Sequence, residues 1–182
     1  MGFINTLKSL FSHKKDSPKN SFEFTSTILP KGFFVVDDEF RKHPEVEITL
    51  PRRSTSKACA YDFFSPEELV LVPGETKLIW TDVKARFSPC LKLAINVRSS
   101  MGKPHIALAN TQGWIDADYA DNISNDGNIG IMLHNFGSED YVIHIGDRIA
   151  QGCLDYWSPI NPGEFADEIW VERTGGFGST GK

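Results

Sequence analysis

The residues best suited to catalysis lie in the segment 113–119, which reads GWIDADY. If this segment is extended, Asp116 and Asp118 project from one face, while Ile115 and Ala117 occupy the other. Two carboxylates this close repel each other, so a chain keeps both where ligands or hydrogen bonds compensate. A carboxylate beside an aromatic ring in a β-hairpin could hold a water molecule against a bound substrate. A solvated hairpin with two ordinary acidic residues is the alternative.

A second group of residues is suited to phosphate oxygens. The segment 98–102 reads RSSMG and follows an alternating strand, so an arginine fork, two hydroxyls and exposed N–H groups gather at one strand end. The segment 146–151, GDRIAQ, opens another strand, in which Asp147 and Arg148 close the turn or pair locally and Gln151 could donate to an anion. A plain strand-end turn with a surface arginine also explains 98–102.

The C-terminal stretch 173–181 reads RTGGFGSTG and has the composition of a phosphate cradle. Its glycines prevent a stable strand or helix, and Phe177 among them could stack over a flat base. The stretch is not a Walker-type loop, because the G-K-[ST] order and the strand-to-helix context are missing. A flexible tail without a ligand is the alternative.

The remaining sequence predicts a β domain that positions these segments. Short turn signals such as Pro73-Gly74 separate the apolar runs, and no interior helix is indicated beyond one or two turns at 37–43. This pattern predicts an all-β fold, an antiparallel sandwich or barrel. Alternating or apolar runs place strands near residues 46–50, 69–72, 78–80, 91–97, 129–133 and 141–145.

Composition narrows the function. The chain has 182 residues, with 24 acidic against 19 basic and a formal net charge of -5, which argues against a general nucleic-acid binder. No apolar stretch is long enough to cross a membrane and no signal peptide is expected, so we expect a cytoplasmic protein. Three widely spaced cysteines predict free thiols and not a disulfide framework or zinc site.

Three regions are expected along the chain. Residues 1–20 form an N-terminal tail with apolar residues at helical spacing, and Gly2 with Thr6 fits a myristoylation pattern, although a short surface tail explains both. Residues 21–172 form the β domain, and residues 173–182 form a flexible, glycine-rich C-terminal flap over the site.

Taken in order, these motifs resemble those of the trimeric dUTP pyrophosphatases (dUTPases). The five motifs correspond here to L-P-R-R leading into A-Y-D-F at 50–63, then 98–102, 113–119, 146–151 and 173–181. Three features depart from the family pattern, namely Cys59-Ala60, the inserted residues Ala120–Asp126 and a shortened tail. In addition, Trp114 stands where the family usually has Val or Leu. The insertion and the tail are similar to a Gram-positive bacterial and phage branch.

The resemblance implies a jelly-roll-like subunit that hydrolyses dUTP to dUMP and pyrophosphate with Mg²⁺. Asp116 would be the general base for the water that attacks the α-phosphorus. Asp62 would support the site, and Mg²⁺ would be held mainly by phosphates and water. The implied substrate-binding residues are Arg98, Ser99, Ser100, Asn110, Gly113, Trp114, Ile115, Tyr119, Gln151, Arg173, Phe177, Gly178, Ser179 and Thr180.

Within that set, Asn110 and the main chain at 113–115 would read uracil, and Tyr119 would exclude a 2′-hydroxyl. Phe177 would cover the base and Arg173 the terminal phosphates. The family's sites are built from three chains, so the expected partners are dUTP and two further copies of this chain.

Two other functions are left open. A dCTP deaminase of the same superfamily shares an R-S-S segment, but it supplies a catalytic Glu, and no Glu lies between Met101 and Leu133 here. A nucleotide-gated regulatory role through a protein partner could use Ala120–Asp126 or residues 1–20 as its contact surface, and it could coexist with catalysis.

Overall fold

The computed structural model describes residues 30–158 and Gly175, and this part is built from strands and short 3-10 turns. The tail 1–20 and the flap residues other than Gly175 lie outside the described residues. No helix in the described part is long and apolar enough to span a membrane. The strands are β1 (Gly32–Val35), β2 (Tyr61–Phe64), β3 (Leu69–Leu71), β4 (Thr76–Trp80), β5 (Val83–Arg86), β6 (Leu91–Asn96), β7 (Ile106–Leu108), β8 (Gly113–Ile115), β9 (Gly130–Asn135), β10 (Tyr141–Ile143) and β11 (Arg148–Tyr156). The 3-10 turns are η1 (Asp38–Phe40), η2 (Ser99–Met101) and η3 (Ala117–Tyr119).

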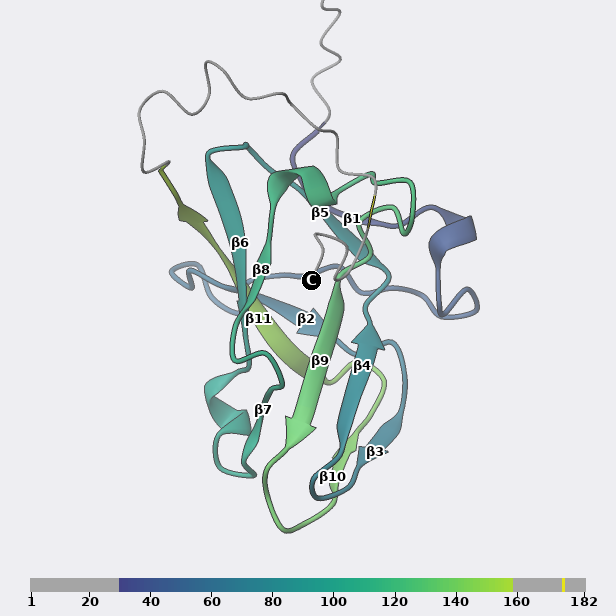
Figure 1. Ribbon diagram of the computed structural model, residues 1–182, viewed down its shortest axis with the longest axis vertical. Helices are drawn as coiled ribbons and strands as arrows, with labels where there is room; N and C mark the ends of the chain where they lie inside the picture. The colour runs from purple at the N-terminus through teal and green to yellow at the C-terminus, as the bar shows by residue number, and fades with distance from the viewer. Residues whose placement is uncertain (1–29, 159–174, 176–182) are drawn as a thin grey trace, which may run out of the picture.

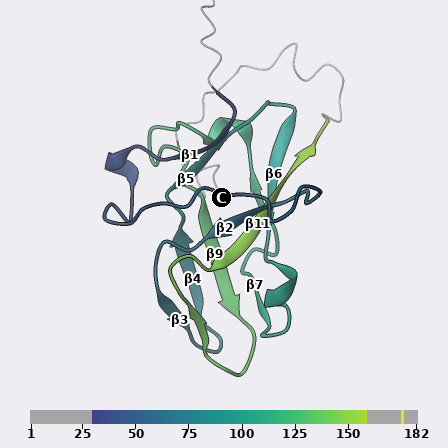
Figure 2. The same ribbon diagram turned by 180° about the vertical axis from the view of Figure 1, so that it is seen from behind.

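Two larger sheets form the body of the fold. One has the strand order β2-β11-β6-β8 and the other β4-β9-β7, while β1 pairs with β5 and β10 with β3. Every pairing between these strands is antiparallel. Figure 1 shows β4 and β9 in front of β2 and β11, and Figure 2 shows the same strands from behind. The predicted all-β, jelly-roll-like antiparallel fold is confirmed.

The core lies between the sheets because alternate residues of their strands face inward. In β9 every second residue is buried, including Ile131 and Leu133, and β6 contributes Leu93 and Ile95. Gly152 on β11 lies close against this core. A Cβ atom at Gly152 would lie 2.9 Å from Phe63 and 3.0 Å from both Ile95 and Leu93, so a side chain there would force these core side chains to shift.

Five of the six predicted strands are confirmed in position, and one is wrong. The alternating segment 46–50 is irregular, with a turn in which the amide of Val46 donates to the carbonyl of His43. Alternation alone does not make a strand, because a strand also needs a partner for its backbone groups. Near this segment, backbone pairing appears as a single bridge between Arg52 and Asp62. The predicted turn at 37–43 is η1.

Candidate functional site

A small pocket collects six of the predicted site residues. Its volume is about 140 Å³, below the 300–1,000 Å³ or so of a site for a whole drug-sized ligand, so it suits part of a nucleotide. The predicted residues that line it are Asn110, Gly113, Trp114, Ile115, Asp116 and Tyr119. The other lining residues, Ile95, Leu108, Gly130, Ile131 and Met132, come from β6, β7 and β9. The pocket is therefore walled by strands of both sheets.

Strand β8 delivers the third motif to this pocket. It pairs with β6, where Gly113 lies opposite Ile95, and a Cβ atom at Gly113 would be 3.3 Å from that of Ile95. At Asp116 the chain is still extended, with φ -82° and ψ 158°, and the amide of Tyr119 then donates to the Asp116 carbonyl at 3.1 Å. This hydrogen bond starts η3 and turns the chain into the pocket wall.

The turn corrects two expectations about this segment. Asp116 and Asp118 do not share one face of a strand, because 117–119 is a 3-10 turn. The segment is also not one arm of a hairpin, since β8 pairs with β6 and β9 pairs with β4 and β7. The hydrogen bond from the Tyr119 amide to the Asp116 carbonyl bends the chain after Asp116. The alternation of a strand therefore does not extend to Asp118. Only Asp116 of the two lines the pocket.

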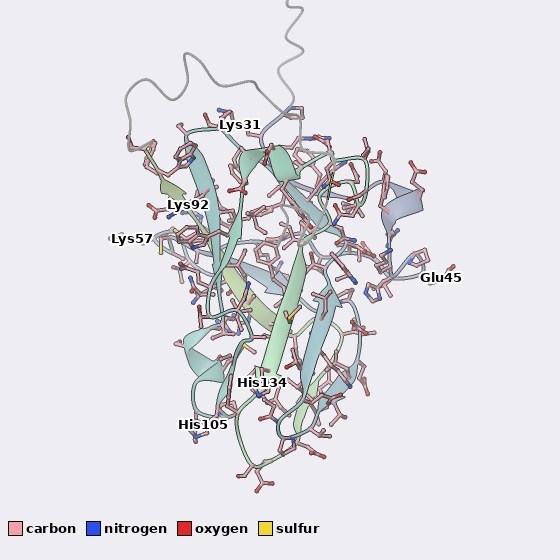
Figure 3. All side chains as sticks on the ribbon, in the orientation of Figure 1. Lys31, Glu45, Lys57, Lys92, His105 and His134 are labelled. Atoms are coloured by element: carbon pink, nitrogen blue, oxygen red, sulfur yellow. The ribbon has the colours of Figure 1, made fainter. Side chains whose placement is uncertain are left out.

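Asp116 supplies the acidic side chain of this pocket. Among the described residues that line it, Asp116 is the only carboxylate and none is a histidine. His134 lies towards the far end of β9 from Gly130, and Figure 3 shows it near His105 at one end of the molecule. The Asp116 residue is exposed to solvent, so a water molecule can reach its carboxylate.

Tyr119 forms a fixed part of the pocket wall. The residue is only 4% exposed, and its hydroxyl donates to the carbonyl of Asn128 at 2.7 Å. The same hydroxyl accepts a hydrogen bond from Nδ2 of Asn125 at 2.8 Å. These contacts hold the phenol at its outer end, so its ring has a defined position beside Asp116.

Trp114 lies at the rim of the pocket. It is 63% exposed, its indole N–H donates to Oε1 of Gln112 at 2.7 Å, and the Lys92 ammonium lies 4.2 Å from its ring centre. Figure 3 shows Lys92 on β6, the strand beside β8. The larger side chain at this position therefore extends over the surface and leaves the pocket open.

Asp62 holds Arg98, one of the residues predicted to bind phosphate. This carboxylate is buried on β2 and accepts hydrogen bonds from Nε of Arg98 at 2.9 Å and from the hydroxyl of Ser54. Arg148 lies 3.7 Å from its second oxygen, so Arg148 pairs across the fold and not within its own turn. Gln151 donates through Nε2 to the carbonyl of Val97 at 3.1 Å.

The turn η2 presents the two predicted serines. The extended Arg98 precedes it, and the amide of Met101 donates to the Arg98 carbonyl at 3.0 Å. Met101 is buried and anchors the turn, whereas Ser99 and Ser100 are exposed. The predicted strand-end turn is therefore present, with both hydroxyls directed to the surface side of the fold.

A second hollow, of about 490 Å³, lies beside Asp62 and is rich in arginine. It is lined by Arg52, Arg53, Ser54, Asp62, Phe64, Gly146 and Arg148. Sequence reasoning missed Ser54, although its position one residue after the L-P-R-R run is a usable signal. In the described part of the chain, neither hollow is lined by Arg98, Ser99, Ser100 or Gln151.

The flap residues Arg173, Phe177, Gly178, Ser179 and Thr180 lie outside the described residues. Within the described part, no group of three or more His, Cys, Asp or Glu residues could hold a metal ion. Cys59, Cys90 and Cys153 are free thiols. Burial raises the pKa of the Cys153 thiol, and the neighbouring Cys59 thiol raises it further.

Comparison with known proteins decides the family. The model of the dUTPase family matches residues 46–181. The chain belongs to the dUTPase family. The match runs through all five motifs and includes both the Asp116 pocket and the Asp62 cluster of this dUTPase.

Named relatives agree with this assignment. The deoxyuridine 5'-triphosphate nucleotidohydrolase of Lactococcus lactis is 38% identical over 152 residues, which are 83% of this chain and 97% of that protein. The crystal structure of the Streptococcus mutans dUTPase has a TM-score of 0.62 and 29% identity, covering 72% of this chain and 99% of that one. A mutant dUTPase from phage phi11 of S. aureus, described with a structural Mg(II) ion, shares the fold with a TM-score of 0.56 at 22% identity, over 71% of this chain and 93% of that one.

Proposed function

We propose that this dUTPase hydrolyses dUTP to dUMP and pyrophosphate, with Asp116 activating the water that attacks the α-phosphorus. The observation that carries the proposal is the position of Asp116 at the end of β8, beside Tyr119 in the pocket wall. The Asp116 carboxylate would accept a proton from the water as the new P–O bond forms. The bond from the α-phosphorus to the pyrophosphate oxygen would then break. Holding that water in line supplies both orientation and base catalysis.

The pocket would recognise the base and the sugar. The Asn110 amide and the main chain at 113–115 would pair with the edge of uracil. Cytosine carries the opposite donor and acceptor at its 4-position, so it would leave buried polar groups unpaired. The Tyr119 ring would pack against the deoxyribose and leave no space for a 2′-hydroxyl.

The triphosphate would be bound by Arg98, Ser99, Ser100 and Gln151. Positive charge and hydrogen-bond donors at this position stabilise the charge that develops on the phosphates. The flap residues Arg173, Phe177, Gly178, Ser179 and Thr180 would close over the substrate and exclude water.

The described donor set fits a magnesium ion that arrives with the substrate. Both oxygens of Asp62 already face Arg98, Ser54 and Arg148, so this carboxylate would reach the ion through water. Mg²⁺ prefers oxygen ligands and retains several waters, so phosphates can supply most of its shell. When bound, the ion would neutralise phosphate charge.

Each active site would be shared between three copies of the chain. The support is that, in the described part of one chain, the lining of the pocket with Asn110, Asp116 and Tyr119 does not include Arg98 or Gln151. A neighbouring chain would bring its phosphate-binding residues to this pocket, and a further chain its flap.

The activity is tested by pyrophosphate release from dUTP, UTP, dTTP and dCTP in the presence of Mg²⁺. We expect rapid release from dUTP and at least about a hundredfold lower kcat/KM for UTP and dCTP. The 2′-hydroxyl of UTP would clash with the Tyr119 ring, and the cytosine of dCTP would leave buried polar groups unpaired. Ammonia release from dCTP would indicate a deaminase instead. Equal turnover of all four nucleotides would refute the proposed base and sugar recognition.

A further inference from the structure

Loop 120–127, which consists of the insertion Ala120–Asp126 and Gly127, is hydrogen-bonded directly to Tyr119. Asn125 donates to the Tyr119 hydroxyl at 2.8 Å, and Asn122 donates to the Tyr119 carbonyl at 2.7 Å. The loop thus contacts both the side chain and the backbone of the residue that lines the pocket. Tyr119 is 4% exposed, so these hydrogen bonds are shielded from competing water.

The loop has a defined internal structure. Oδ1 of Asn122 accepts hydrogen bonds from the amides of Ser124 and Asn125 at 3.0 and 3.1 Å, and the amide of Asp126 donates to the Asn122 carbonyl at 2.9 Å. Gly127, at φ +79°, closes it. A Cβ atom at Gly127 would lie 2.8 Å from the Tyr119 carbonyl oxygen and 2.6 Å from Cα of Ala120, so only glycine permits this approach.

A buried lysine anchors the loop to β5. The Lys84 side chain is 4% exposed, and its ammonium lies 2.6 Å from Asp126 and 3.1 Å from Asp121. Arg86, also on β5, binds both oxygens of Asp121 at 2.6 and 2.7 Å. The two acidic residues of the loop are therefore fixed by two cations of one strand.

We propose that loop 120–127 is a specificity element of the nucleotide site, in which Asn125 is a positioning residue for the Tyr119 ring and Lys84 anchors the loop. This inference rests on the proposed function. A ring that excludes a 2′-hydroxyl must resist displacement, because a shift by the width of an oxygen atom would admit a ribonucleotide. The hydrogen bond from Asn125 and the anchored loop add to the resistance that the hydrogen bond from the Tyr119 hydroxyl to the Asn128 carbonyl supplies.

The test compares kcat/KM for dUTP and UTP in the full chain and in Asn125→Ala. We expect the dUTP-to-UTP ratio to fall about three- to tenfold, the effect of about one net hydrogen bond. Most of the change should be an increase in kcat/KM for UTP. The kcat for dUTP should stay within about twofold of that of the unchanged protein, because Asp116 is untouched. Ile123→Ala is the matched control, since Ile123 is in the same loop but 77% exposed, and it should leave the ratio unchanged.

Tyr119→Phe provides a second variant that keeps the ring and removes both hydrogen bonds of the hydroxyl. It should lower the same ratio by at least as much as Asn125→Ala, because it also removes the bond to the Asn128 carbonyl. If Asn125→Ala does not fold, an unchanged ratio in Tyr119→Phe would show that hydrogen bonds to the hydroxyl do not position the ring. An unchanged ratio in the folded variants would overturn the positioning role. Failure of the proposed function would be seen separately, as a wild-type protein that releases no pyrophosphate from dUTP.

Discussion

Replacing Lys84 with methionine should destabilise the protein far more than replacing an exposed lysine. The Lys84 ammonium lies 2.6 Å from Asp126, 3.1 Å from Asp121 and 3.4 Å from Asp37. Burial pushes the pKa of Lys84 down, but the hydrogen bonds and charges of Asp126 and Asp121 outweigh burial, and the pKa lies above its ordinary value of 10.5. The lysine is therefore charged at neutral pH, and all three contacts are ionic.

The size of the effect depends on what each carboxylate keeps in Lys84→Met. Asp121 retains Arg86, and the Asp37 side chain, 71% exposed, is solvated. Asp126, whose side chain is 8% exposed, keeps the hydrogen bond from the amide of Asp37 and becomes a buried, poorly compensated charge. Breaking a buried pair in this way costs about 3–5 kcal/mol. We take the lower end, about 3 kcal/mol, because that one hydrogen bond remains.

The measurement is thermal unfolding followed by far-ultraviolet circular dichroism at pH 7. At this chain length, about 3 kcal/mol lowers Tm by about 6–12 °C. Protein concentration must be fixed, because association of chains also stabilises the fold. Lys77→Met is the control: Lys77 is 38% exposed and pairs with Glu75 at 3.3 Å, so its loss should cost less than about 1 kcal/mol. Equal Tm losses in the two variants would refute the reasoning.

Four further outcomes are expected. Asp116→Asn should lower kcat on the order of a thousandfold while dUTP still binds, measured by pyrophosphate release and calorimetry, and near-normal turnover would contradict its role. A chain ending before Arg173 should lose most activity without a change in Tm, and unfolding on truncation would contradict a flap. Gly152→Ala should cost about 1–3 kcal/mol in urea unfolding, because its Cβ meets three core side chains. Hydrogen bonds from Arg86 hold the pKa of Asp121 below its ordinary 3.8, so the stabilisation from Asp121 is present above about pH 4 and is lost as pH falls further. Asp121→Asn should therefore make the free energy of unfolding depend less on pH between about pH 5 and 2. An unchanged pH dependence in this range would count against the reasoning.

Local sequence signals were sufficient for most of the fold. Alternation at 91–97 and 141–145 predicted strands that exist as β6 and β10, because every second residue of such a strand must enter a core. The same alternation at 46–50 was misleading, since no strand among the described residues pairs with that segment. Strand pairing is a long-range property, and periodicity contains no information about the partner.

The sequence by itself was enough to indicate the family of this protein. Ordered motifs with an aspartate, an amide, hydroxyls and arginines indicated the family, because functional groups and their spacing are local properties of the chain. The resemblance to that family then implied which residue would activate water. Even the insertion Ala120–Asp126 was visible as an interruption of the third motif.

The tertiary structure alone decided which groups meet. Through one 3-10 turn, it placed Asp116 in the pocket and Asp118 outside it. It also brought Lys84 into contact with Asp126, about forty residues away in sequence. A lysine at this position reads as an exposed residue, because lysine is almost never buried unless it is paired. Its partners come from distant segments, and only folding brings their charges within contact distance.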